Sequence, residues 1–344
     1  MPTETAFVAT NWQSSGIKID KKRLKQLCKR YDKPGLIYLA KWALALFVSG
    51  AVVWATLGTW LVWPAMIAYG TIMMVPGYCL SHETAHGTPF RSRWLNETVL
   101  WVTSFIYMEE PLHRRMHHTS HHTFTWHIDK DSQMPFDTPM DFKGWLIEIS
   151  GISLLKYHIK ELLELTVGHF SQHTREVSQV GDLPKMARGA RIFMAIYLGI
   201  AIAIFMGQLW LLWFLVLPRF LGIPAMMLYG LIQHVELQEN SPSILESTRS
   251  FKTNAFGRFL YANMNFHCEH HLFPQVPFYA LPELNREIRD QLPEPDPGFF
   301  RTQFEVLSVV IRRSLKKNTK AKSIRQAPHM ITEGGYQPIA TKSM

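Results

Sequence analysis

Histidine is the residue type whose spacing in this chain most directly suggests chemistry. The stretch SHETAHGT, residues 81–88, places His82 and His86 four positions apart, so both imidazoles would share one face of a helix. With Glu83 between them the pattern is HExxH, in which many metallopeptidases hold zinc and use the glutamate as a base. Because two such imidazoles bind almost any borderline metal, this motif alone leaves the metal and the reaction open.

Two further segments share a second histidine pattern. Residues 113–131 and residues 265–277 each contain HxxHH, a spacing of i, i+3 and i+4 that predicts three imidazoles on one helical face. Few functions other than metal binding require the same triple of titratable side chains twice in one chain. The sequence therefore predicts that both triples are metal ligands. They are His118, His121 and His122, and His267, His270 and His271.

A ninth candidate ligand is His234, which stands in LIQHVELQEN where an apolar run ends. Zinc usually takes three or four protein ligands, and six is about the most that one metal accepts. Nine imidazoles therefore imply two metals held close together, whereas a peptidase site would leave most of them unexplained. The remaining histidines are not counted among these nine. His113, His117 and His127 are left open as ligands, supports or solvated neighbours, and His158, His169, His173 and His329 are expected to be ordinary polar residues.

The elements that must position these histidines are predicted to be membrane helices. Mean hydropathy is only −0.03, but the apolar residues are concentrated. Residues 42–81 contain no charged side chain, and residues 192–233 contain only Arg219, which we expect to reach outward to the interface. Since a span needs about 20 apolar residues, each run has room for two helices and a turn. We expect the turns near Leu57-Gly58-Thr59-Trp60 and Met206-Gly207-Gln208.

Charge placement predicts the orientation of these spans. Residues 18–33 and 301–325 each carry eight Lys or Arg, while the two turns carry none, so both termini and the histidine segments are expected in the cytosol. The net charge of +9 comes mostly from these flanks and indicates anionic lipid headgroups rather than nucleic acid. No signal peptide is evident. Residues 142–165 read as one helix lying on the membrane surface.

The predicted fold is therefore an all-α integral membrane protein with four transmembrane helices, arranged as two hairpins beneath a cytosolic histidine-rich helical cap. Three parts are expected: a basic cytosolic segment (1–34), a membrane domain (35–316) and a disordered tail (317–344). Four acids beside the ligands are candidate hydrogen-bond partners for their imidazoles. They are Glu83, Asp129, Asp131 and Glu269.

The three histidine groups resemble the three histidine boxes of the integral-membrane fatty acid desaturase and hydroxylase superfamily. The boxes read HETAH, then RxxHxxHHxxT from Arg115 to Thr125, then HCEHHLFPQVP, and the likeness covers about residues 60–285. The resemblance implies a non-haem di-iron centre that activates O2 at the cytosolic face. Its ligands would be the eight box histidines together with His234. Some acyl-CoA desaturases have an asparagine four residues before that last histidine, where this chain has Gly230.

This resemblance implies O2-dependent oxidation of a fatty acid or fatty acyl lipid, with desaturation as the expected outcome. Hydroxylation and oxidative decarboxylation of a free fatty acid to a terminal alkene remain open. The chain lacks haem, dinucleotide and iron–sulfur motifs, so a separate ferredoxin, rubredoxin or cytochrome-type donor with its reductase is expected. The expected membrane is the bacterial inner membrane, otherwise the endoplasmic reticulum. A metal transporter or sensor and a metallopeptidase are the alternatives from other classes.

Overall fold

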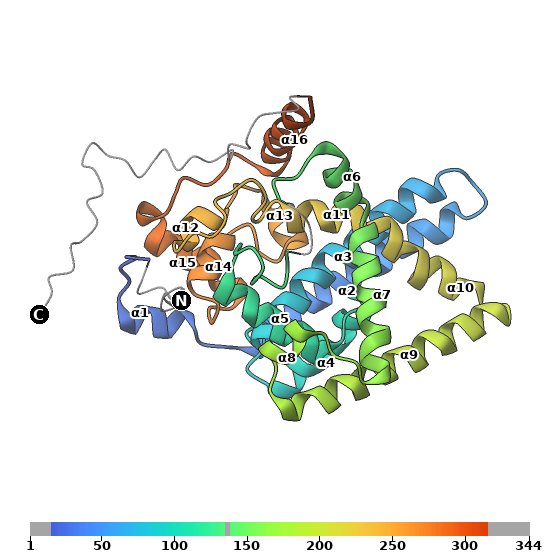
Figure 1. The fold of residues 1–344 in the computed structure, drawn as a ribbon. Helices are drawn as coiled ribbons and strands as arrows, with labels where there is room; N and C mark the ends of the chain where they lie inside the picture. Colours follow the sequence, from blue (N-terminus) through green and yellow to red (C-terminus); the bar gives the residue numbers. More distant parts are fainter. Residues whose placement is uncertain (1–14, 135–137, 316–344) are drawn as a thin grey trace, which may run out of the picture.

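A computed structural model describes residues 15–134 and 138–315, and these described residues form helices and no strand. Figure 1 shows the arrangement. The longer helices are α2 (Asp32–Thr56), α3 (Val62–His86), α4 (Arg93–Tyr107), α5 (Pro111–Phe124), α7 (Ile152–Val167), α9 (Leu183–Phe205), α11 (Leu217–Leu231) and α16 (Phe299–Leu315). The shorter ones are α1 (Lys21–Leu27), α6 (Phe142–Ser150), α8 (Gln172–Val177), η1 (Val180–Asp182), α10 (Leu209–Leu211), η2 (Leu212–Val216), α12 (Ile244–Ser247), α13 (Ala255–Leu260), α14 (His267–Leu272), η3 (Phe278–Ala280), α15 (Leu281–Ile288) and η4 (Arg289–Gln291).

Two helical hairpins carry most of the apolar sequence. The chain reverses between α2 and α3 at Gly58, and between α9 and α10 at Gly207, and both glycines have the positive φ that such turns require. Both predicted turns are thus confirmed. In Figure 1 they project to the same side of the molecule, away from α14 and α15. Around them large apolar side chains are exposed, including Trp60 and Phe205, as expected of a lipid-facing surface.

Three helical stretches are long and apolar enough to cross a membrane. These are Asp32–Thr56, Val180–Phe205 and Leu209–Leu231. The remaining predicted span, the second in chain order, corresponds to α3, which like α2 has 25 residues but ends in the polar run SHETAH. The structure therefore supports membrane insertion of three helices, and the four-span arrangement stays a proposal.

The helices α3 and α11 cross in backbone contact. A Cβ added to Gly70 would lie 2.3 Å from the carbonyl oxygen of Pro218, and one added to Gly222 would lie 2.1 Å from the carbonyl oxygen of Gly70. Small residues that let two helix backbones touch are the usual packing device inside membranes. This contact fixes the polar end of α3 against the end of α11, where His234 follows.

Two expectations about the apolar segments were wrong. Arg219 does not reach outward: it is buried, and its guanidinium lies 4.5 Å from the ring centroid of Phe105, which offers the cation an aromatic face inside the protein. The predicted helix over residues 142–165 is broken into α6 and α7 at Gly151. Gly151 has φ +75°, and a Cβ there would lie 1.9 Å from the side chain of Ile223 on α11, so close packing enforces the break.

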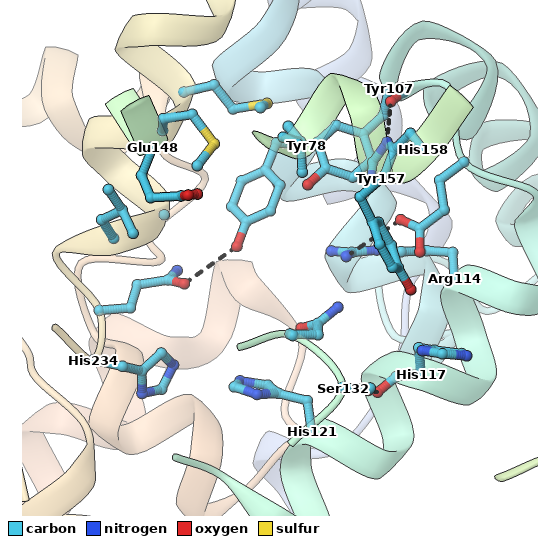
Figure 2. Close-up of a pocket in the computed structure, with 18 of the residues that line it drawn as sticks. Tyr78, Tyr107, Arg114, His117, His121, Ser132, Glu148, Tyr157, His158 and His234 are labelled. Carbon is cyan, nitrogen blue, oxygen red and sulfur yellow. Dashed lines mark hydrogen bonds and ion pairs between the residues drawn. The ribbon is translucent and has the colours of Figure 1, made fainter. Parts of the chain in front are cut away.

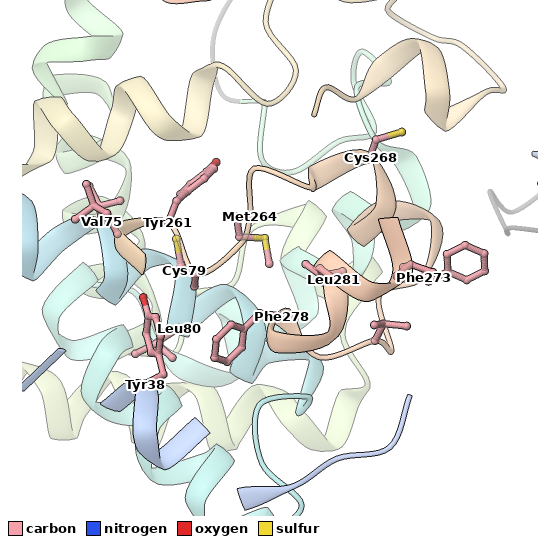
Figure 3. Close-up of a cluster of buried hydrophobic side chains, with 14 of the residues drawn as sticks. Tyr38, Val75, Cys79, Leu80, Tyr261, Met264, Cys268, Phe273, Phe278 and Leu281 are labelled. Atoms are coloured by element: carbon pink, nitrogen blue, oxygen red, sulfur yellow. The ribbon is translucent and has the colours of Figure 1, made fainter. Parts of the chain in front are cut away.

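A hydrophobic cluster joins the first hairpin to the segment that carries the third histidine group. Figure 3 shows Tyr38 of α2 and Leu80 of α3 facing Phe278, with Met264 and Leu281 continuing toward α14. The ring of Tyr38 meets that of Phe278 edge-on, and its hydroxyl donates to the carbonyl of Phe259. This packing holds α14 against the end of α3, although the two are about 180 residues apart in sequence.

The predicted division into three parts stays a prediction. The N-terminal segment packs on α15, since Arg23 pairs with Glu283 and Glu287. The helix α2 runs across the proposed boundary at residue 34. The predicted disordered tail, residues 317–344, lies outside the described residues, as does His329.

Candidate metal centre

The structure brings all nine predicted ligands together in two adjacent groups. Within each group one nitrogen of every ring lies within 4.8 Å of the others. The two groups touch, because the ring of His122 stacks on that of His271 with centroids 4.2 Å apart. The first group is His82, His86, His118, His122 and His270, and the second group is His121, His234, His267 and His271.

Each HxxHH triple is divided between the two groups. The i, i+4 pair His118 and His122 belongs to the first group while His121 belongs to the second, and in α14 the division is reversed, with His270 alone in the first group. A helix turns about 100° per residue, so side chains at i and i+4 nearly align while those at i+3 and i+4 diverge by about 100°. The expectation that each triple shares one face was therefore too simple: each triple bridges two sites.

The ring nitrogens are spaced as metal ligands would be. In the first group His82 Nε2 lies 2.7 Å from His270 Nε2, and His118 Nε2 lies 2.9 Å from His86 Nε2. In the second group His267 Nε2 lies 3.0 Å from the Nε2 atoms of both His234 and His271. Metal–imidazole bonds of about 2.1 Å at right angles hold neighbouring nitrogens about 3.0 Å apart. Both groups therefore fit a bound transition metal ion.

Local sequence positions these helices. The C-terminal end of α3 is set by Gly87, whose φ of +66° closes the helix just after His86. The start of α5 is set by Pro111 at its first turn and by Glu110, whose carboxylate accepts from the backbone N–H of His113 at 2.7 Å. Three of the nine histidines then follow on α5.

Asp131 orients a candidate ligand of the second group. Both of its carboxylate oxygens lie 2.9 Å from Nδ1 of His121, and they also accept from the backbone N–H groups of Trp126 and Gln133. Burial favours a higher pKa for Asp131, but His121 and these N–H groups outweigh it and hold the pKa below its usual value. Because a carboxylate accepts, Nδ1 of His121 carries the proton and Nε2 is free for a metal.

Other ligands are oriented in the same way. Nδ1 of His118 donates to Gln133 Oε1 at 3.1 Å, and Nδ1 of His234 donates to the carbonyl of Ser247 at 2.8 Å. Nδ1 of His271 lies 3.1 Å from the hydroxyl of Thr125, which itself donates to the carbonyl of His121. Each contact leaves Nε2 directed at its group.

Arg249 holds the backbone of the segment around His234. It is fully buried, and its guanidinium donates to the carbonyls of Ile232 at 2.7 Å and Val235 at 3.1 Å and pairs with Asp296 at 2.9 Å. These carbonyls end α11 and flank His234, so the arginine closes the helix at the ligand. No pattern in the sequence pointed to Arg249.

The four candidate acids differ in their contacts. Besides Asp131, Glu83 is buried with its Oε1 3.4 Å from Nδ1 of His270, while its Oε2 accepts from Thr88 and from the backbone N–H of Phe278. Glu269 instead accepts from Ser250 and Asn285. Asp129 is exposed. Asp131 and Glu83 thus contact ligands.

A pocket reaches the second group. Figure 2 shows His121 and His234 on one side of it, opposite Tyr78 and Tyr157, and the hydroxyl of Tyr78 lies 3.2 Å from Gln233. Its empty volume is about 900 Å³ with the open solvent at its mouth included. The other lining residues include an apolar part with Leu154, Met226, Met227 and Leu231, and a polar part with Glu109, Arg114, Gln133 and Glu148.

The histidines without an assigned role fall into two kinds. His113 and His117 form a third group with Glu161, described below. His127 is partly exposed and lies 3.1 Å from the carbonyl of Thr125, and His158 donates to the carbonyl of Tyr107 at 2.9 Å. His169 is exposed. The expectation of ordinary polar roles fits His158 and His169.

Comparison with known proteins agrees with this geometry. The family model for fatty acid desaturase matches residues 58–303, which include α3, the second hairpin, the nine histidines and the pocket. No match was found among curated proteins. The match covers well over half of the chain, and on this basis the chain belongs to the fatty acid desaturase family.

Proposed function

We propose that this protein is a membrane-bound non-haem di-iron enzyme that uses O2 to oxidise the aliphatic chain of a fatty acid or fatty acyl lipid, with desaturation as the outcome. Membership in the fatty acid desaturase family makes it an oxidoreductase. The observation that carries the proposal is a pocket whose wall includes His121 and His234, two members of the second histidine group.

The donor set supports iron rather than a hard cation. Nine neutral imidazoles do not suit magnesium or calcium, which prefer oxygen. When bound, two iron ions supply the activation of O2 and the removal of hydrogen from an unactivated methylene. The protein's own residues do the rest: Asp131, Thr125 and Ser247 fix the ligands of the second group, and the pocket excludes water from the reacting carbon.

The pocket accounts for the class of substrate. Met226, Met227 and Leu231 of α11 and Leu154 of α7 offer an apolar surface to an alkyl chain beside the second group. Gly230 lies on the same wall and has open space where a side chain would be. Glu109, Arg114 and Gln133 form a polar part that suits a head group.

The stoichiometry of the proposed reaction requires an external electron donor. Forming one double bond from two methylenes and reducing O2 to two waters consumes two further electrons and two protons. We propose that a ferredoxin, rubredoxin or cytochrome-type protein supplies the electrons at the basic cytosolic face. Purified protein with O2 alone should then give no turnover, and full turnover under those conditions would contradict this part of the proposal.

The proposed topology has four spans, in which α3 joins the three more apolar stretches. It places both termini and the histidine groups in the cytosol. A reporter fused after residue 344 tests this orientation. If a reporter that is active only in the periplasm or lumen showed activity, the orientation would be the opposite of the one proposed. The bacterial inner membrane is the proposed location, otherwise the endoplasmic reticulum.

Two functions from other classes fit less well. A peptidase would need Glu83 to activate water, but that carboxylate is buried and engaged by Thr88 and Phe278. A metal transporter would need ligands along the spans, whereas the nine histidines lie on α5 and α14, at the end of α3 and just after α11.

Mass spectrometry of cells fed deuterated fatty acids tests the function, with wild type and His121→Ala compared. We expect a wild-type product lighter by two hydrogen isotopes, and its position will report how the chain lies in the pocket. An added oxygen would mean hydroxylation, and an alkene one carbon shorter would mean decarboxylation. A His121→Ala variant that still forms product, or a wild type that leaves fatty acids unchanged with a donor present, would contradict the proposal.

A further inference from the structure

A third cluster of metal-ligating side chains lies outside the two histidine groups. His113 and His117 of α5 and Glu161 of α7 place one ligand atom each within 4.8 Å of one another. Both histidines are buried, with 0% and 3% of their surface exposed. Their ring centroids lie 3.8 Å apart, with the ring planes tilted by 31°. This is the same i, i+4 spacing as His118 and His122 on the same helix.

Two buried nitrogen atoms at this cluster have no hydrogen-bond partner. They are Nδ1 of His117 and Nε2 of His173, which approaches from α8 with its ring centroid 5.1 Å from that of His117. Because a buried polar atom without a hydrogen-bond partner is unfavourable, such atoms indicate a missing partner. Nε2 of His113 also approaches Glu161 Oε1 to 2.5 Å without hydrogen-bond geometry.

The simplest rival is a buried ion pair. Burial disfavours a charged ring at His113, but the carboxylates of Glu161 and Glu109 outweigh it and raise the pKa of His113 to about 10. A protonated His113 between two carboxylates accounts for that residue. It leaves a second imidazole whose centroid is 3.8 Å from that of the charged ring, and it gives no partner to Nδ1 of His117 or Nε2 of His173.

We propose that His113, His117 and Glu161 bind a third metal ion of the zinc class, with His173 as the fourth ligand. Two or three imidazoles with one carboxylate form one of the ligand sets that hold zinc in proteins. The ion would tie α5 to α7 and α8. Since α5 carries His118, His121 and His122, the third ion would hold the helix that supplies both other groups.

Zinc stoichiometry tests the proposal on the full-length protein in detergent. The protein is stripped with a chelator, refilled with Zn²⁺ alone, washed and measured by elemental mass spectrometry. We expect Glu161→Gln and His113→Gln to hold one zinc fewer than wild type. Glu164→Gln is the matched control, because Glu164 lies one turn along α7 outside the cluster and should keep the wild-type content. This difference does not depend on the proposed function.

Equal zinc content in wild type and Glu161→Gln would overturn the proposal and leave the ion pair as the explanation. A second measurement needs no variant and so is not affected by misfolding. Anomalous scattering at the zinc edge from the wild type should show a peak between His113 and Glu161, and density lacking a peak there in zinc-soaked protein would overturn the proposal as well.

Discussion

The contact between Asp131 and His121 gives the sharpest test of the two-group arrangement. Asp131→Asn removes the charge and replaces one accepting oxygen with an amino group that faces N–H donors. Hydrogen bonds to charged groups contribute about 1.5–3 kcal/mol, which corresponds to about 10- to 150-fold in affinity. Partners of metal-bound histidines typically contribute about 10- to 100-fold, so the two ranges agree.

Only the second group contacts Asp131, through His121. We therefore expect Asp131→Asn to lower the affinity for one of the two proposed irons by about 10- to 100-fold. The iron of the first group should be retained. The assay is iron content by elemental mass spectrometry after dialysis against a graded series of chelator concentrations. Wild type should lose its iron within a single range of chelator concentrations. The variant should lose its first equivalent of iron at a lower chelator concentration than wild type does.

Asp129→Asn is the matched control, because it makes the same change two residues away at an exposed position. It should behave as wild type. The reasoning would be refuted if Asp131→Asn kept both irons at every chelator concentration, or if both irons were lost in parallel.

Three other substitutions test the pocket and the scaffold. Gly230→Leu should fill open space on the pocket wall while the protein keeps its iron. If the new side chain displaces three substrate methylenes at about 0.8 kcal/mol each, kcat/KM for long chains should fall about 50-fold. An unchanged chain-length preference would show that this wall does not contact the substrate. Gly222→Ala should lower stability by about 1–3 kcal/mol in thermal unfolding, whereas Gly199→Ala, with open space around it, should not. Arg249→Met should lower stability by about 3–5 kcal/mol and reduce iron content through His234, and a fully loaded, stable variant would contradict its supporting role.

The identity of the ligands could be predicted from sequence because their spacing is local. Histidines at i, i+3 and i+4 indicate helical metal ligands wherever the helix lies, and the nine predicted residues do come together. Their division between two groups was not foreseen. It depends on how α5 and α14 face each other across the site, and the 100° turn between His121 and His122 matters only once the second helix is in place.

The residues that orient the candidate ligands were harder to predict from the sequence. Asp131 stands near His121 in sequence and could be suggested, but Ser247 acts through its backbone carbonyl and Arg249 through carbonyls of another segment. No side-chain pattern reports such contacts. Arg219 was misassigned for a related reason, since the aromatic face that holds it, Phe105, comes from a helix more than 100 residues earlier.

The central claim is that nine histidines hold two iron ions next to a pocket for an aliphatic chain. Mössbauer spectroscopy of the purified protein loaded with ⁵⁷Fe tests it most directly, with iron per chain measured on the same sample. We predict two irons per chain in nitrogen-rich environments, and a loss of one on replacing His234. A single iron per chain in fully loaded protein, or iron that survives removal of His234 unchanged, would contradict the account.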